Sequence, residues 1–206
     1  MKKVLTLLFG AFLATAAMAQ TAEEIISHME EVMDAGQDKG LVMTMDMKIP
    51  IVGTFSTTAY ALGDKMCMEG NVAGKRVIAW MDSTTSWTYD VEANTIEIEN
   101  RDGKSSEAED IAKMLDGITD GYGVSVKKQT ADAWYITCKK LRTNTNKDDP
   151  RTMELVVAKG SYMPVSLSAT VSLVTVTIRN LAFGVNESQV TFVQSNYPGV
   201  MIVDKR

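Results

Sequence analysis

Apolar and polar residues alternate along the stretch Leu41–Ile49, whose sequence is LVMTMDMKI. Its odd-numbered positions are all apolar, three of them methionine, whereas its even-numbered positions are mostly polar. Because successive side chains of a β-strand point to opposite faces, this alternation predicts a strand with one apolar face built largely of methionine. A sheet made of such strands must cover that face, so the identity of the cover bears directly on function.

Two amphipathic helices are the candidate covers. Thr21–Glu24 has the form of a capping box, in which the threonine and glutamate side chains bond free backbone N–H groups, and apolar residues follow at helical spacing. Ser106–Glu109 is a second capping box, and the helical stripe after it includes Ile111, Met114 and Leu115. Both helices are expected to lie on the apolar face of the sheet.

Short alternating segments separated by turn residues fill most of the remaining chain, a spacing typical of an antiparallel meander. Met66 and Met68 repeat the methionine pattern, and Trp87 and Tyr89 share one face of a later segment. Strands are expected at 54–62, 65–69, 75–81, 86–90, 95–100, 124–130, 133–141, 153–158 and 162–169. The fold class is therefore mainly β with added helices.

The C-terminal third contains one irregularity of phase. Apolar residues occupy alternate positions up to Leu173 and then shift by one residue at Val174, which indicates a bulge or a turn between them. Final strands are expected at 190–193 and 200–203. The chain shows no internal repeat.

Residues 1–19 have the pattern of a secretory signal peptide. Two lysines precede a short apolar core, and Ala17-Met18-Ala19 forms an A-x-A cleavage site before Gln20. Because glutamine rather than cysteine follows the expected cut, no lipidation is expected at the new N-terminus. We therefore expect a periplasmic protein in which residues 20–206 form one domain.

The charge of the chain bears on its partners. The formal net charge is −5 at pH 7, and removal of the two N-terminal lysines brings it to about −7. No basic cluster is longer than a pair of residues. This distribution argues against nucleic acid as a partner.

Two cysteines in an oxidising compartment raise the question of a disulfide. Closing the loop between Cys67 and Cys138 would contribute roughly 4 kcal/mol in the chain-entropy description. The alternation argues against the bridge, because Cys67 faces outward if Met66 faces inward, whereas Cys138 joins an inward-facing Trp134. Cysteines on opposite faces of a sheet cannot meet, although the sequence leaves both states open.

Residues suited to catalysis are few. His28 is the only histidine and falls between the apolar positions of its helix, so a histidine-based metal site or catalytic triad is not expected. No nucleophile elbow, P-loop or dinucleotide fingerprint is present. Paired carboxylates such as Glu97 and Glu99 fall on the polar face of a strand. We expect no enzyme activity, cofactor or metal.

Methionine is abundant, with 14 residues in the chain. Its flexible, polarisable side chain suits surfaces that accept varied apolar ligands, although it also fills ordinary cores. The arrangement favours the first interpretation, because many one-sided strands are covered by only two predicted helices.

Three stretches resemble the outer-membrane lipoprotein carrier family (LolA-like). Residues 63–69, GDKMCME, are similar to that family's strand after the first hairpin. Residues 82–90, DSTTSWTYD, resemble its D-G-K-T-x-W-x-Y-D/N turn, with Ser83 in place of glycine. Residues 190–204 resemble its aromatic and proline-containing C-terminal close. The resemblance in element order extends over residues 20–206.

This resemblance implies an open, incomplete antiparallel β-barrel whose concave face is covered by the N-terminal helix and the helical insertion. Such proteins carry lipoprotein acyl chains between the inner and outer membranes, with an inner-membrane release complex and an outer-membrane acceptor as partners. The resemblance also implies a monomer. Lys65 stands nearest to the family's strand arginine that holds the lid, and lysine keeps that charge without the planar fork.

Together these observations predict a cavity for acyl chains or related lipids, each buried methylene contributing roughly 0.8 kcal/mol. The predicted lining is Met43, Met45, Met47, Met66, Met68, Trp87, Tyr89, Ile111, Met114 and Leu115. The main alternative is a non-transporting module of the cell envelope that senses or binds lipids or lipoproteins. A closed lipocalin-like barrel is disfavoured by the helix predicted midway through the strands.

Overall fold

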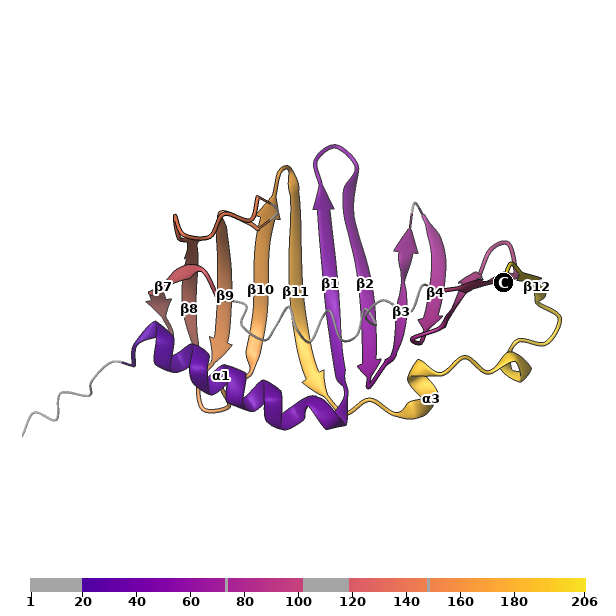
Figure 1. Cartoon of the computed structure of the whole chain (residues 1–206), viewed down its shortest axis with the longest axis horizontal. Helices are drawn as coiled ribbons and strands as arrows, with labels where there is room; N and C mark the ends of the chain where they lie inside the picture. The colour runs from indigo at the N-terminus through magenta and orange to yellow at the C-terminus, as the bar shows by residue number, and fades with distance from the viewer. Residues whose placement is uncertain (1–19, 73, 102–118, 148) are drawn as a thin grey trace, which may run out of the picture.

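The computed structural model describes residues 20–72, 74–101, 119–147 and 149–206. Most of them form one sheet of twelve strands, with α1 (Ala22–Gly36) lying across one of its faces (Figure 1). The strands are β1 (Leu41–Ile49), β2 (Gly53–Leu62), β3 (Lys65–Val72), β4 (Lys75–Met81), β5 (Thr85–Asp90), β6 (Thr95–Asn100), β7 (Tyr122–Gln129), β8 (Ala133–Lys140), β9 (Thr152–Ala158), β10 (Pro164–Val171), β11 (Val174–Phe183) and β12 (Met201–Asp204).

The strand order is β12-β6-β5-β4-β3-β2-β1-β11-β10-β9-β8-β7. Neighbouring strands are antiparallel except for β12, which pairs with β6 in parallel. The central pair, β1 with β11, joins segments far apart in the sequence. β7 and β12 end the described sheet without pairing to each other, so the predicted open, non-closed sheet is confirmed.

The N-terminal helix begins with the capping box that the sequence predicts. The Thr21 hydroxyl accepts a hydrogen bond from the Glu24 N–H at 3.2 Å, and the Glu24 carboxylate accepts one from the Thr21 N–H at 3.0 Å. Near its other end, a Cβ on Gly36 would lie 2.2 Å from the Phe183 ring of β11, so glycine permits this close contact. The buried apolar side chains of α1 are Ala22, Ile25, Ile26 and Met29.

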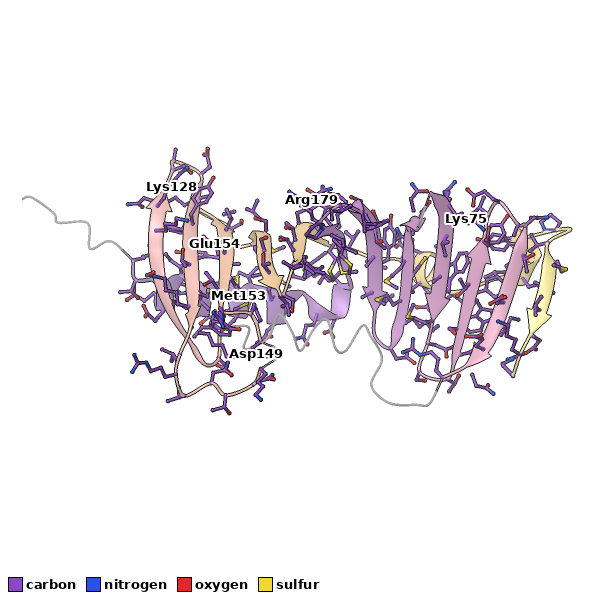
Figure 2. All side chains as sticks on the ribbon, turned by 90° about the horizontal axis from the view of Figure 1, so that it is seen from above. Lys75, Lys128, Asp149, Met153, Glu154 and Arg179 are labelled. Atoms are coloured by element: carbon purple, nitrogen blue, oxygen red, sulfur yellow. The ribbon has the colours of Figure 1, made fainter. Side chains whose placement is uncertain are left out.

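α1 and the strands beneath it form the main core of the described residues. Ile25 of the helix belongs to the same buried cluster as Ile136 of β8, Leu155 of β9 and Ile178 of β11. In Figure 2, Met153 lies on the α1 side of β9 and its neighbour Glu154 on the opposite side. The alternation of β9 thus separates an apolar inner face from a polar outer face.

The predictions near the C-terminus have mixed outcomes. Val171 pairs with Val174, so the phase change marks a two-residue turn, as one of the two sequence interpretations predicted. The strand predicted at 190–193 is wrong, because α3 (Glu187–Val190) ends at Val190 and residues 191–193 form no strand. The Gln189 side chain accepts a hydrogen bond from the Asn186 N–H at 2.8 Å, which favours a helical turn. The helix predicted from Ser106 lies outside the described residues.

Candidate functional site

The methionines of β1 become more exposed along the strand. Met43 is 0% exposed, Met45 is half-buried, and Met47 is 44% exposed. Met43 belongs to the cluster beneath α1, whereas Met47 lies toward the end of β1 that points away from this helix (Figure 1). The described part of the structure therefore covers this methionine stripe at one end and leaves it open at the other.

The apolar face continues on both sides of β1. Met45 is paired with Ile178 of β11, which is in turn paired with Leu167 of β10. On the other side, Met43 is paired with Ala59 of β2, which is paired with Met68 of β3. We call this continuous surface the methionine face.

The methionines of β3 lie on the same face. Met66 is 1% exposed and forms a small buried cluster with Ala61 and Met81. Met68 packs against this cluster and also against the cluster beneath α1, so it connects the two. The structure thus brings together five of the predicted lining residues: Met43, Met45, Met47, Met66 and Met68.

Trp87 and Tyr89 do not join them. Trp87 is paired with Trp80, which is paired with Cys67. Cys67 and Trp80 alternate with the methionines of β3 and β4, and Trp87 alternates with Ser86, which is paired with Met81. They therefore point to the opposite face, which we call the outer face. The grouping of Trp87 and Tyr89 with the methionines is corrected here, because the pairing of β3, β4 and β5 sets them on opposite sides of the sheet. Ile111, Met114 and Leu115 lie outside the described residues.

On the outer face these aromatic side chains are covered by the segment between α3 and β12. Phe192 stacks on Trp87 with ring centroids 5.6 Å apart, and it also lies 5.5 Å from Trp80. Tyr197 meets Tyr89 edge-on at 5.2 Å. We call these five rings the aromatic cluster. The sequence resemblance included Phe192 and Tyr197 but gave no indication of the face they cover, because that depends on the path of the chain after β11.

Lys65 also contacts the chain that follows β11, residues 184–206, which we call the C-terminal segment. Its ammonium pairs with the carboxylate of Glu187, the first residue of α3, and this hydrogen bond raises the pKa of Lys65 and lowers the pKa of Glu187. At the far edge, Lys205 pairs with Glu97 at 2.7 Å and with Glu99 at 3.1 Å. These three ion pairs fasten the C-terminal segment to the sheet.

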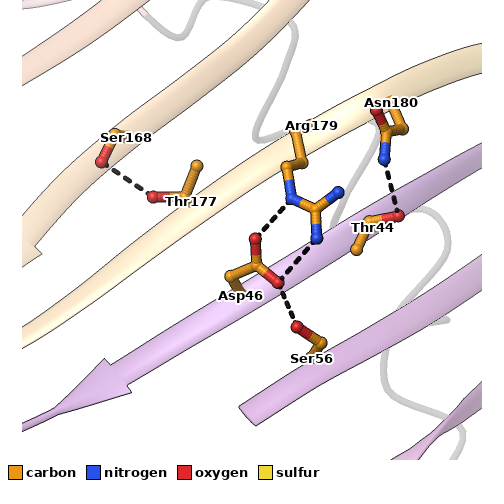
Figure 3. A network of polar contacts seen from close by, with 7 residues as sticks. All are labelled: Thr44, Asp46, Ser56, Ser168, Thr177, Arg179 and Asn180. Atoms are coloured by element: carbon orange, nitrogen blue, oxygen red, sulfur yellow. Dashed lines mark hydrogen bonds and ion pairs between the residues drawn. The ribbon is translucent and has the colours of Figure 1, made fainter. Parts of the chain in front are cut away.

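The outer face of the central strands is polar (Figure 3). The Arg179 guanidinium of β11 donates to both oxygens of Asp46 on β1, at 2.5 and 3.2 Å, and the Ser56 hydroxyl of β2 donates to the same carboxylate. The hydrogen bond from Arg179 is the main cause that lowers the pKa of Asp46. On β10 and β11, the hydroxyls of Ser168 and Thr177 lie 3.0 Å apart. These contacts link β2, β1, β11 and β10.

Both cysteines are free and buried, on opposite faces. Cys138 belongs to the cluster beneath α1, whereas Cys67 faces the aromatic cluster, so the phase argument against a disulfide is confirmed. Burial raises the pKa of each thiol to about 11. Each cysteine therefore lies beneath a different cover, Cys138 beneath α1 and Cys67 beneath the aromatic cluster.

Other groups with chemical potential are sparse in the part of the chain that the structure describes. No group of three or more His, Cys, Asp or Glu side chains is placed to hold a metal ion there. The exposed His28 bonds Glu31 at 3.2 Å, and its ring lies 4.9 Å from that of Tyr162. None of the described helices is long and apolar enough to span a membrane.

No family model and no curated protein sequence matches the chain. Solved structures do match. LprF from Mycobacterium bovis is 10% identical, with 82% of this chain and 96% of that chain covered and a TM-score of 0.50. The Mycobacterium tuberculosis lipoprotein LppX is 10% identical, with coverages of 77% and 93% and a TM-score of 0.48.

A LolA superfamily protein from Nitrosomonas europaea is also among the matches, as the sequence resemblance predicted. It is 9% identical, with 84% of this chain and 99% of that chain covered and a TM-score of 0.34. At these identities the likeness to LprF concerns the fold alone. The structure defines the class as a mainly β protein with one open, non-closed sheet, and its function must be argued from the methionine face.

Proposed function

We propose that this protein binds the acyl chains of lipoproteins or related lipids on the methionine face and carries them through the periplasm from the inner to the outer membrane. The observation that carries this proposal is the change in exposure along β1, from 0% at Met43 to 44% at Met47. An apolar face that is covered at one end and open at the other offers an acyl chain both an entrance and a place to extend.

The chemistry of the face suits such a ligand. Methionine side chains adapt to apolar ligands of different shape, and each methylene removed from water contributes roughly 0.8 kcal/mol. Ile25 and Met29 of α1 belong to the same buried cluster as Met43, and Met45 packs against this cluster. An acyl chain that lies along Met45 would therefore take the place of apolar contacts made by α1. Apolar contacts are not directional, so the ligand replaces them without leaving polar groups unpaired.

The wider function rests on the sequence. The signal-peptide pattern of residues 1–19 supports export without lipidation, and the LolA-like motifs support an inner-membrane release complex and an outer-membrane acceptor as partners. We propose a monomer that acts by binding and release, without catalysing a reaction and without a cofactor.

The test compares two neighbouring positions of β1 that point to opposite faces. Met45 and Thr44 are both half-buried, Met45 on the methionine face and Thr44 on the outer face. Binding of a fluorescent fatty acid is measured for Met45→Lys and Thr44→Lys. Met45→Lys should weaken binding at least tenfold, because a buried ammonium beside an acyl chain has no partner, whereas Thr44→Lys should bind as the unchanged protein does.

The fold of both variants is checked by circular dichroism. If Met45→Lys fails to fold, Met45→Gln provides the same comparison with nearly the same shape. Equal binding by the two variants would sink the proposal, as would the absence of any lipid when the protein is purified gently and analysed by native mass spectrometry.

A second candidate is a module that senses or binds lipids or lipoproteins without transporting them. It is favoured by the contact of Lys65 with Glu187, because that ion pair fastens the C-terminal segment rather than α1. Incubation with lipoprotein-loaded inner-membrane vesicles distinguishes the two candidates. A carrier releases lipoprotein into solution and delivers it to acceptor vesicles, whereas a sensing module binds without delivery.

A further inference from the structure

Two turns of the sheet present largely exposed apolar side chains. In the turn between β1 and β2, Ile51 is 107% exposed and Val52 is 64% exposed. In the turn between β10 and β11, Leu173 is 74% exposed. We call these three residues the apolar tips. The pairing of Lys48 with Thr175 sets the two turns side by side, at the end of the central strands that points away from α1 (Figure 1).

The backbone at these turns is unusual. Ile51 has a φ of 71°, a left-handed conformation that β-branched residues rarely adopt. Ser172, which precedes Leu173, has a φ of 57°. Conformations of this kind are unfavourable and cluster at functional sites. Neither the core nor a described neighbour covers the Ile51 side chain, so its orientation into solvent has no packing explanation within the described residues.

The tips are also nearly free of charge. Lys48 is the single charged residue in 47–57, and 168–177 has none. Charged residues make up 23% of the chain, so about five would be expected in stretches of this combined length. No carboxylate there would have to be desolvated or would repel a phosphate, which fits an apolar environment bordered by lipid headgroups.

The shape favours a bilayer over a protein as the occupant. A stable protein interface buries about 800 Å² on each partner, with matching surfaces, whereas the apolar tips are two narrow projections. A bilayer adapts to projections of any shape and accepts each apolar side chain individually. We propose that the apolar tips insert into the boundary between headgroups and acyl chains of a phospholipid membrane.

The role of membrane insertion rests on the proposed function, the transfer of acyl chains. Met47 and Val171, 44% and 43% exposed, lie next to the tips, and Met47 continues into the methionine face. With the tips in a bilayer, this face begins at the membrane surface. An acyl chain then passes between membrane and protein along apolar side chains without crossing open water.

The test measures binding of the purified protein to vesicles of phosphatidylethanolamine and phosphatidylglycerol by co-sedimentation. The variant I51S/V52S/L173S should bind at least tenfold more weakly, because burying even one such side chain in an apolar environment is worth about that factor. The matched control V126S/L141S/M201S removes three apolar side chains that are 37%, 46% and 60% exposed elsewhere. The control should bind vesicles as the unchanged protein does.

Three further readings separate the explanations. Binding should persist on phosphatidylcholine vesicles and at high salt, since one lysine supplies little electrostatic attraction. Binding of the fluorescent fatty acid by I51S/V52S/L173S should be unchanged, so a failure of the tips is distinguished from a failure of the methionine face. Equal vesicle binding by both triple variants overturns the inference, as does a change from dimer to monomer in I51S/V52S/L173S, which would assign the tips to a second copy of the chain.

Discussion

The strands beneath α1 bury apolar side chains on one face, whereas the strands beneath the C-terminal segment bury them on both faces. In β8 to β11 and β1, the inner face is buried by the helix and the outer face carries polar contacts such as Asp46 with Arg179. In β3 and β4, the methionines face inward as well, but the outer face of β3 to β5 is also apolar and lies beneath Phe192 and Tyr197.

This difference separates the side chains that stabilise β3 to β5 from those that would contact a ligand. The aromatic cluster holds β3 to β5 from the outside, so these strands have a source of stability that does not involve the methionine face. Among the described residues, the strands beneath α1 have no second apolar cover, because their outer face is polar. A ligand that displaces α1 contacts would therefore affect one part of the sheet while the aromatic cluster remains in place.

The largest expected effect concerns the two thiols, which report on the two parts separately. With a pKa raised to about 11, each native thiol should have roughly 100-fold less thiolate than an ordinary cysteine. Cys138→Ala leaves Cys67 to be measured, and Cys67→Ala leaves Cys138. Each should react with a colorimetric disulfide reagent at least 100-fold more slowly in the native protein than in urea. Rapid native labelling of either would contradict its burial.

The next-largest effect is expected from a substitution in the core beneath α1. Ile25 is fully buried, so Ile25→Ala should lower the free energy of unfolding by about 3 kcal/mol in urea titrations. Met33→Ala, at a half-buried position of the same helix, should have a smaller effect. In single-cysteine backgrounds, Ile25→Ala should accelerate labelling of Cys138 more than that of Cys67. Equal acceleration would mean that the two parts open together.

A smaller effect is expected from a substitution in the aromatic cluster. Phe192→Ala removes contacts with Trp80, Trp87 and Tyr197 and should lower the free energy of unfolding by about 2 kcal/mol, since the ring is only half-buried. Val193→Ala, at a more exposed neighbouring position, is the control. The thiol pattern should reverse, with faster labelling of Cys67. Unchanged Cys67 labelling would show that Phe192 does not protect it.

The polar outer face gives a pH-dependent effect. The pKa of Asp46 is lowered in the folded protein, chiefly by Arg179, so its stabilisation is present above the ordinary pKa of 3.8 and is lost as pH falls through the lowered value. Asp46→Asn should lower the urea midpoint at neutral pH, and the difference from the unchanged protein should shrink in acid. A difference independent of pH would contradict this assignment.

The smallest effect concerns Lys65. Its ion pair with Glu187 is partly exposed, so Lys65→Met should leave the urea midpoint nearly unchanged, as should Glu187→Gln. Binding of the fluorescent fatty acid should also be the same in both variants. If Lys65→Met alone altered ligand binding, Lys65 would act on the ligand cover independently of Glu187, as the family resemblance implied.

Much of this arrangement follows from local pattern. The alternation in Leu41–Ile49 predicts β1 with its observed bounds, and the Thr21 capping box marks the start of α1, because both signals depend on neighbouring residues. The opposite faces of Cys67 and Cys138 follow from the same alternation.

The remaining features depend on distant pairing. β3 and β4 have apolar residues in both phases, and β5 has them in one phase that does not itself indicate a face. The prediction that groups Trp87 and Tyr89 with the methionines is decided only by the pairing of Met66 with Met81 and of Trp80 with Trp87. The cover formed by Phe192 depends on how the chain returns across the sheet after β11. No local sequence pattern predicts the course of the chain after β11.

The central pairing of β1 with β11 has a consequence for folding. β1 to β6 and β7 to β11 are each made of consecutive antiparallel neighbours, whose contacts are close in sequence. Their junction requires Leu41 to meet Phe183, so the middle of the sheet is completed only after nearly all of the chain is available. As the chain is synthesised from its N-terminus, the edge of β1 therefore stays unpaired until β11 is available.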